Sequence, residues 1–509
     1  MTKLNIEKTS NKESFKTRFF NHYVYPAFRF TELSLFGYAR DALFNQEELI
    51  KKILTPIALE DKQGIALARV GPWLPLGQTR YIAVIVPKSI KDLDELLKDV
   101  ETQPDGRSVL NSFSEMIGQT LSNNTGHFAR HERQKLLNFT GNVPLFYPII
   151  QKNFKEALHE WSKKEDSFVL LDAIKLLMRQ TTSEAMIGKD QKLTEEENTN
   201  VNLGFKWIKQ KLLFPYSIST ALNFNYQKNV YKNASSKFIE KHMADLKRGL
   251  EQPKTNVLAD IIREDEAIKN ATSINLEAQI HETTDRAMLI TGAMDGVYIN
   301  LVGILLQLIK HPDVIKKLRY ELDQSCEIDE SDYKTLKESD LKNHEFKPTY
   351  LDQVIKEGLR YISSAPIIPR YTSIGVNKGN IKLPPYTTIL INIEGLHHDK
   401  KFWGDDADTF NPDRWSRERI KEVKQFKDEH FLPFSTGPRP CPGIKVGILS
   451  LRAFISELIL NYDLIASPNQ AEPIVDPTSA LVVDIGPGFK VSLEKRISPV
   501  NEIVTSYSM

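Results

Sequence analysis

One cysteine of this chain lies where its thiolate could bind a metal ion. Cys441 is part of Phe434-Ser-Thr-Gly-Pro-Arg-Pro-Cys-Pro-Gly443, in which Gly437 can adopt a turn conformation that other residues disfavour. The apolar spacing of residues 444–460 predicts an amphipathic helix directly after this segment. Free N–H groups and the helix dipole stabilise a thiolate placed just before a helix N-terminus. The segment therefore predicts a thiolate on a turn, a ligand that suits haem iron.

The same residues carry a family resemblance. Phe, Gly, Arg, Cys and Gly at these offsets are similar to the F-x-x-G-x-R-x-C-x-G signature of the cytochrome P-450 superfamily of haem-thiolate monooxygenases. The resemblance implies that Cys441 binds the iron of haem b, that Arg439 pairs with a haem propionate, and that Phe434 and Gly443 border the haem. Without the resemblance, a cysteine between two prolines is more often a small buried residue.

A charge network is expected upstream of the cysteine. Glu357 and Arg360 are three residues apart, so on a helix they share a face and can form an ion pair. Such a pair is usually exposed to solvent and contributes about 0–1 kcal/mol. Phe410-Asn-Pro-Asp-Arg-Trp415 resembles the P-E-R-F-type segment of the family, which implies that Arg414 is a third member of a buried network. We expect this network to fix the loop that carries the thiolate.

Further haem contacts are implied by the resemblance. Arg370 is a second candidate for a propionate, and His131 and Lys135 have a spacing like the family's H-x-x-x-R, with lysine in place of arginine. The adjacent His397 and His398, with carboxylates nearby, could suggest zinc instead. Neighbouring histidines rarely share one metal, and their spacing matches no recognised zinc motif.

The segment that resembles the oxygen-binding helix departs from its family. Gly292-Ala-Met-Asp295 fits the pattern, but Gly296 stands where an alcohol is expected. The resemblance implies that Asp295 belongs to an acid–alcohol pair that relays protons to dioxygen at the haem. We assign Asp295 and Gly296 to the catalytic site. Either a substrate group or an ordered water replaces the hydroxyl, or the reaction does not need it. Gly296 could equally give room to a bulky substrate.

Composition limits the partners and the compartment. The 509 residues are 41% hydrophobic and 26% charged, with a net charge of +1, which favours a globular chain that binds no nucleic acid. Two cysteines, Cys326 and Cys441, predict a reducing compartment, although they could pair with each other. We find no signal peptide and no transmembrane helix, so we expect a cytoplasmic protein with at most peripheral membrane contact.

The expected architecture is mainly α with a small β domain. Residues 65–70 and 81–86 predict two strands, and residues 88–360 are mostly helical in pattern. Extended segments at 364–370, 381–385 and 387–393 would complete the smaller sheet. The resemblance implies the cytochrome P-450 fold, with haem between the oxygen-binding helix and the cysteine loop. We assign residues 46–509 to one catalytic domain and residues 1–45 to an aromatic-rich segment that packs on the core or rests at a membrane interface.

The resemblance implies a monooxygenase that inserts one oxygen atom from O2 into a small organic metabolite, or otherwise oxidises it. Secondary metabolism of a terpenoid, polyketide or cyclic dipeptide is our expectation. No dinucleotide-binding glycine motif is visible, so NAD(P)H would act through a separate reductase of the flavoprotein or ferredoxin type. Two alternatives are an isomerase or dehydratase that acts on a peroxide without a reductase, and a non-catalytic haem sensor.

Overall fold

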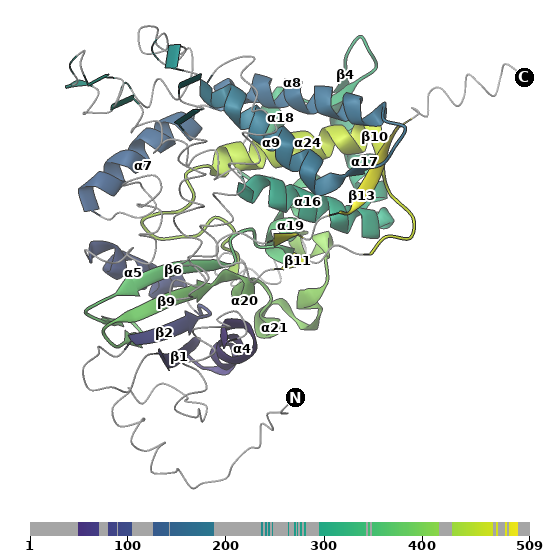
Figure 1. Ribbon diagram of the computed structural model, residues 1–509. Helices are drawn as coiled ribbons and strands as arrows, with labels where there is room; N and C mark the ends of the chain where they lie inside the picture. Colours follow the sequence, from purple (N-terminus) through teal and green to yellow (C-terminus); the bar gives the residue numbers. More distant parts are fainter. Residues whose placement is uncertain are drawn as a thin grey trace, which may run out of the picture.

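The computed structural model describes residues 49–70, 80–88, 90–103, 126–141, 143–187, 295–342, 349–416, 430–471 and 488–496, with short pieces between 236 and 280 and at 345–346, 475–476 and 484–485. Helices make up most of these residues, and Figure 1 shows a small sheet beside them at one end of the molecule. The expected class, mainly α with small sheets, is confirmed. Residues 1–45, expected to be an aromatic-rich N-terminal segment, lie outside the described residues.

Four strands form the largest sheet, in the order β1, β2, β9 and β6. β1 (Ile65–Val70) and β2 (Arg80–Ile85) are antiparallel, as the sequence predicts. β9 (Thr387–Asn392) lies parallel to β2, and β6 (Ile367–Thr372) closes the sheet against β9. Alternate side chains of β9 are buried, which is why this short apolar run forms a strand in the sheet.

One extended segment was expected in this sheet and is not part of it. β8 (Ile381–Leu383) pairs with β7 (Val376–Lys378) in a separate two-stranded hairpin. Gly379 has a φ of +53°, a left-handed conformation that turns the chain so that Ile381 pairs with Lys378. The expectation that this segment completes the smaller sheet is therefore wrong, because a tight local turn supplies its partner strand.

The helical body surrounds one long buried helix. α24 (Ile444–Asn461) follows the cysteine, as expected, and Figure 1 shows it among the other helices. The expectation that this helix is amphipathic is wrong, because residues 446–461 are buried on every face. Those helices are α7 (Gly126–Thr140), α8 (Val143–Ser162), α9 (Leu170–Ile187), α16 (Asp295–Lys310), α17 (Pro312–Ser325), α18 (Glu338–Lys342) and α19 (Tyr350–Tyr361). The expected helix break at Pro312 is confirmed, because a proline suits the first turn of a helix.

Shorter elements complete the described chain. Before the large sheet lie the helices η1 (Leu49–Leu54) and α4 (Thr55–Glu60), and α5 (Ile90–Thr102) follows β2. The hairpin of β4 (Cys326–Ile328) and β5 (Lys334–Leu336) follows α17. Four short helices connect β9 to the cysteine region, namely α20 (Ile393–His397), α21 (Lys400–Trp403), η3 (Asp405–Asp408) and η4 (Pro412–Trp415).

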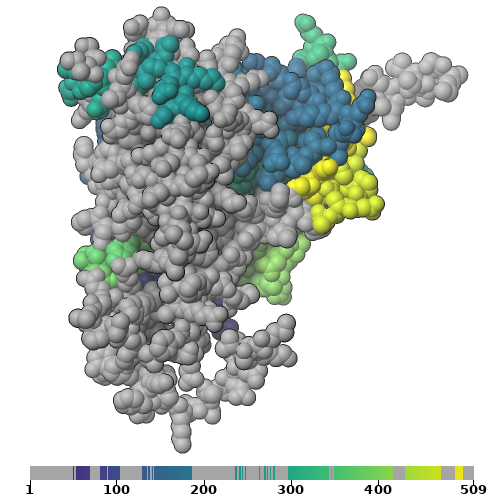
Figure 2. All heavy atoms as spheres, viewed as in Figure 1, coloured from purple at the N-terminus to yellow at the C-terminus, as the bar shows by residue number. Residues whose placement is uncertain are grey.

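The C-terminal strands pack on the helical body. β10 (Tyr462–Ala466) pairs with β13 (Lys490–Lys495), which also pairs with β3 (Phe168–Val169), and β11 (Val475–Asp476) pairs with β12 (Asp484–Ile485). In the space-filling view of Figure 2, α8 and α9 (blue) and these strands (yellow) form adjoining parts of one surface.

The cysteine loop, residues 430–443, lies at the boundary of two hydrophobic clusters. Leu432 is buried in the cluster that includes the large sheet and α5. Phe434 packs against the other cluster, which is built from α8, α16, α19 and α24. These two side chains are two residues apart and pack in different clusters. The position of the loop therefore depends on the packing of both hydrophobic clusters.

Candidate functional site

The cysteine loop is a tight turn followed at once by α24. Cys441 N donates a hydrogen bond to Phe434 O over 2.8 Å, which closes the turn. Gly437 has a φ of +78°, and a Cβ there would lie 3.1 Å from the side chain of Leu97. The expected need for glycine at this position is therefore confirmed on two grounds, conformation and space. Gly443 is the N-cap of α24, so Cys441 precedes the helix by three residues.

The surroundings of the thiol act on its pKa in opposite directions. Burial raises the pKa of Cys441, while the Gly443 N–H and the positive charge of Arg133 lower it. The side chain of Cys441 is nevertheless exposed. A Cβ at Gly443 would lie 3.9 Å from Cys441 Sγ, so the glycine leaves space beside the sulfur. The thiol is thus surrounded by protein but accessible to a ligand.

α7 holds the cysteine loop through two residues that the sequence analysis missed. Arg133 Nη1 donates to Pro440 O over 2.7 Å, and Thr140 Oγ1 donates to Pro442 O over 2.6 Å. These carbonyls belong to the residues on either side of Cys441. Seven residues separate Arg133 from Thr140, so they share one face of α7, and this spacing was the available signal.

His131 and Lys135 are the two residues of α7 that were expected to contact the haem. His131 is exposed to solvent, and the side chain of Lys135 lies outside the described residues. Arg133, two residues from each of them, is the described cation of α7 that contacts the loop.

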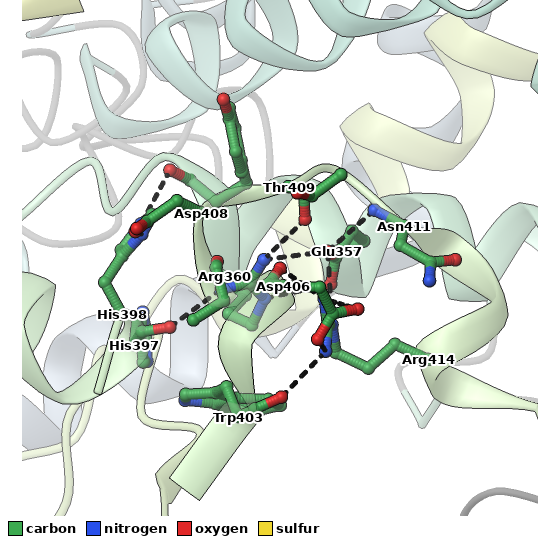
Figure 3. Close-up of polar contacts among 12 residues, drawn as sticks. Glu357, Arg360, His397, His398, Trp403, Asp406, Asp408, Thr409, Asn411 and Arg414 are labelled. Atoms are coloured by element: carbon green, nitrogen blue, oxygen red, sulfur yellow. Dashed lines mark hydrogen bonds and ion pairs between the residues drawn. The ribbon is translucent and has the colours of Figure 1, made fainter. Parts of the chain in front are cut away.

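The charge network is buried and fully bonded around Arg360. Its Nε and Nη2 donate to the two Glu357 oxygens over 3.0 and 2.8 Å, and both side chains are 0% exposed. Nη1 donates to the carbonyls of His397 and Ala407, and Nη2 also donates to that of Thr409 (Figure 3). A guanidinium has five N–H donors. Each of them has an acceptor here.

Glu357 of α19 connects this helix to the segment that follows η3. Its carboxylate accepts hydrogen bonds from Asn411 N and from Trp415 Nε1, each over 2.9 Å. Arg414 lies 3.5 Å from Glu357 and makes closer contacts with Asp406, as Figure 3 shows. The structure thus brings the three expected members together, with Asp406 as an additional acid. The paired charges offset the cost of burying them.

His397 joins the network to the cysteine loop. Its carbonyl accepts from Arg360, while Leu432 N donates to its Nε2 over 3.0 Å. Nε2 is therefore the acceptor nitrogen, and Nδ1 carries the hydrogen and donates to Ser363 Oγ over 2.7 Å. Burial, followed by the charges of His398 and Arg360, holds the pKa of His397 well below its usual value. A neutral imidazole thus fixes the start of the loop.

His397 and the neighbouring His398 do not face a common ligand. The ring of His398 contacts Asp408 and the carbonyl of Tyr361, away from the partners of His397. No cluster of metal-binding side chains is found among the residues that the structure describes.

Two arginines expected at haem propionates have partners in the protein. Arg439 forms an ion pair with Glu101 at the end of α5. Arg370 is 5% exposed in β6, and its Nη1 donates to Pro369 O over 2.8 Å. Arg439 is thus bonded to α5, whereas the bond of Arg370 to Pro369 O lies within its own strand.

The segment expected to bind oxygen is described only from Asp295 onward. α16 begins there, and the side chain of Asp295 lies outside the described residues together with residues 281–294. A Cβ at Gly296 would have Ser364 Oγ at 3.5 Å. The side chain of Val297 lies 3.9 Å from the corresponding position at Gly447. The start of α16 therefore lies against the start of the helix that follows Cys441.

The two cysteines of the chain are both free. Cys326 lies in β4, where its thiol approaches Asp323 O at 3.7 Å. The thiol of Cys441 is therefore not consumed by a disulfide.

Comparison with known proteins shows the family. The sequence model of cytochrome P-450 matches residues 72–492, so the chain belongs to the cytochrome P-450 family. A crystal structure of a cytochrome P-450 superposes with a TM-score of 0.59 over 82% of this chain and 89% of that chain. At 15% identity this likeness shows the fold, which confirms the expected architecture.

Curated relatives match part of the chain. Isoflavone 2'-hydroxylase of Glycyrrhiza echinata is 35% identical over 35% of this chain and 32% of its own length. Eupatolide synthase of Helianthus annuus is 31% identical over 34% of this chain and 32% of its own length. Flavonoid 3'-monooxygenase of Crocosmia x crocosmiiflora is 29% identical, over 44% of this chain and 42% of that protein. The alignments thus span about a third to two fifths of each relative.

The family implies a haem held by a cysteine thiolate, and the residues present fit that group. Cys441 has an accessible sulfur with a glycine gap beside it, and a helix N-terminus follows. Among the described helices, none is long and apolar enough to cross a membrane.

Proposed function

We propose that this protein is a haem-thiolate monooxygenase with Cys441 as the iron ligand. The observation that carries the proposal is the fixation of the cysteine loop from two sides, by Arg133 and Thr140 of α7 and by His397. A ligand loop bonded at both ends can present one sulfur in a constant direction. Three relatives named as a synthase, a hydroxylase and a monooxygenase support an oxidative reaction on a small organic metabolite.

Residues of the chain have distinct roles in this proposal. Haem b, when bound, supplies the activation of O2, and the thiolate donates electron density that favours O–O cleavage. Arg370 and Arg439 bind the propionates, with His131 and Lys135 as further candidates, and Phe434 and Gly443 border the macrocycle. Glu357, Arg360 and Arg414 keep the loop in place without touching the reacting atoms.

The substrate and partners are also proposals. We infer a lipophilic secondary metabolite, of the terpenoid, polyketide or cyclic dipeptide class, in line with the flavonoid and isoflavone names of two relatives. Electrons come from NAD(P)H through a separate flavoprotein or ferredoxin-type reductase. We place the protein in the cytoplasm, with peripheral membrane contact.

The absence of an alcohol at Gly296 favours a second candidate function. An isomerase or dehydratase that rearranges a peroxide needs neither O2 nor a reductase. A reductase-fed assay of O2 consumption, compared with turnover of a lipid hydroperoxide without reductant, separates the two. Turnover of the hydroperoxide alone, with no reductant-dependent oxidation, would replace the monooxygenase proposal.

The thiolate is tested by the absorption spectrum of the reduced carbon monoxide complex. We expect the long-wavelength Soret band that thiolate ligation produces, and its loss in Cys441→Ala. Cys326→Ala is the matched control and should keep the band. A wild-type spectrum without this band, or one unchanged by Cys441→Ala, would falsify ligation by Cys441.

A further inference from the structure

A buried amide on α16 has a hydrogen-bond acceptor that the described chain does not use. Asn300 is 7% exposed, and its Nδ2 donates to Ser364 Oγ over 3.2 Å. Its Oδ1 is buried and has no hydrogen-bond partner among the residues that the structure describes. A buried polar atom without a partner costs about 1–3 kcal/mol. We therefore expect a hydrogen-bond donor at this oxygen.

Because residue 296 is a glycine, it places no side chain in the space next to Asn300. Gly296 precedes Asn300 by one helical turn, so the two residues share a face of α16. Ser364 Oγ is the neighbour recorded within 4 Å of an ideal Cβ at Gly296, at 3.5 Å. Ser364 itself is half-buried and belongs to the segment between α19 and β6. A small polar group can thus lie between the glycine and the amide.

The hydrogen-bonding capacity of the two side chains defines what fits there. Ser364 Oγ accepts from Asn300 Nδ2, which leaves the serine hydrogen free to donate. Asn300 Oδ1 can accept. An occupant that accepts from Ser364 and donates to Asn300 completes a closed ring of three hydrogen bonds. A hydroxyl meets this demand, whereas a carbonyl group cannot donate and a cation cannot accept.

We propose that Asn300, Ser364 and Gly296 form a hydroxyl subsite that holds an ordered water or an alcohol group of the substrate. The occupant would stand at the position where the family resemblance places an alcohol and this chain has none. This role rests on the proposed monooxygenase function, whereas the subsite itself follows from the donors and acceptors. It makes Ser364 and Asn300 positioning residues for a hydroxyl that the chain lacks at residue 296.

The subsite is tested by a crystal structure of the haem-loaded wild-type protein without substrate. We expect a solvent oxygen within about 3.5 Å of both Asn300 Oδ1 and Ser364 Oγ. A second crystal soaked in isopropanol separates the two sources. Replacement of the water by the alcohol oxygen assigns the subsite to alcohols, and retention of the water assigns it to solvent. Either result supports a hydroxyl occupant.

Variants provide matched comparisons in the same crystal form. Ser364→Ala removes the donor to the occupant, and we expect loss of the water peak. In Gly296→Thr we expect the new hydroxyl to take the place of the water. Gln307→Leu is the control, because Gln307 is another buried amide, two turns further along α16. It should leave the water in place.

The proposal is overturned if Asn300 Oδ1 is dry in the wild type or bonded to another side chain of the protein. A water that persists in Ser364→Ala with its other contacts unchanged would also overturn it. These outcomes are independent of the carbon monoxide spectrum. A thiolate spectrum with a dry Asn300 rejects the subsite alone, while an occupied subsite without that spectrum rejects the monooxygenase proposal alone.

Discussion

At the scale of single residues, the buried ion pair of Glu357 and Arg360 shows how the site is held. Each charge is 0% exposed, and the guanidinium also bonds three backbone carbonyls from the segment 397–409. The pair therefore holds the backbone of residues 397–409 in place, which an ion pair on the surface would not do. The contribution of the pair to stability depends on its complete set of partners, because removal of one member leaves the other charge buried and unpaired.

Glu357→Gln should destabilise the protein strongly and weaken haem retention. The change leaves Arg360 and Arg414 without their shared carboxylate, for which we expect a loss of about 3–5 kcal/mol in the free energy of unfolding. Urea unfolding and the haem content after gel filtration measure the two effects. Asp413→Asn is the control, since Asp413 pairs with Lys317 where both side chains are more than half exposed. It should cost less than about 1 kcal/mol. Equal effects of the two variants would contradict the network.

At the scale of elements, close contacts between helices set the positions of the loops. A Cβ at Gly358 of α19 would lie 2.1 Å from the side chain of Ile304 in α16. Glycine thus lets α19, which carries the ion pair, approach α16, which carries Gly296. The same α24 that follows Cys441 is also bonded to the hairpin of β4 and β5, where Tyr333 donates to Glu457 Oε2 over 2.9 Å.

Glu457 should make stability depend on pH in an unusual direction. Burial raises the pKa of Glu457 to about 8, so the native state keeps a proton that the unfolded state, with a pKa of about 4.3, releases. The contribution is complete below pH about 4.3 and is lost as the pH rises towards 8, by roughly 1.4 kcal/mol per pH unit.

Unfolding measured by urea from pH 5 to 9 checks this contribution. Glu457→Gln should remove the decline, while Glu330→Gln, a change at an exposed position near the hairpin, should retain it. A wild-type profile parallel to that of Glu457→Gln would show that Glu457 is charged in the folded protein.

At the scale of the whole molecule, the cysteine loop is assembled from distant parts of the chain. Leu432 and Phe434 fasten it to two hydrophobic clusters, and α7 bonds the carbonyls beside Cys441. Arg133 and Pro440 are 307 residues apart in sequence. The acidity of the thiol therefore depends on the docking of α7.

Arg133→Gln should make the Cys441 thiol less acidic. Glutamine can keep a donor to Pro440 O but removes the positive charge that lowers the pKa of Cys441. In haem-free protein with the Cys326→Ser background, we expect iodoacetamide to alkylate Cys441 about threefold more slowly at neutral pH. Arg130→Gln, a change at an exposed residue of α7, is the control. An unchanged rate in Arg133→Gln would show that its charge does not reach the sulfur.

Short-range patterns in the amino-acid sequence predict the family, the thiolate candidate and most of the described helices and strands near the site. The turn at Gly437, the helix after Cys441, the break at Pro312 and the contact of Glu357 with Arg360 each involve residues within one or two turns of chain. The apolar pattern of residues 381–383 does not identify their partner strand, which is set by the left-handed turn at Gly379.

The contacts between these parts depend on packing between residues that are distant in sequence. Arg133, Thr140 and His397 bond the cysteine loop from 35 or more residues away in sequence. Asn300 meets Ser364 across 64 residues. The spacing of Arg133 and Thr140 places them on one face of α7, but it does not identify their partners, because those contacts arise where elements distant in sequence pack together. The sequence thus predicted the ligand, and the packing of α7, α16 and α19 decided what surrounds it.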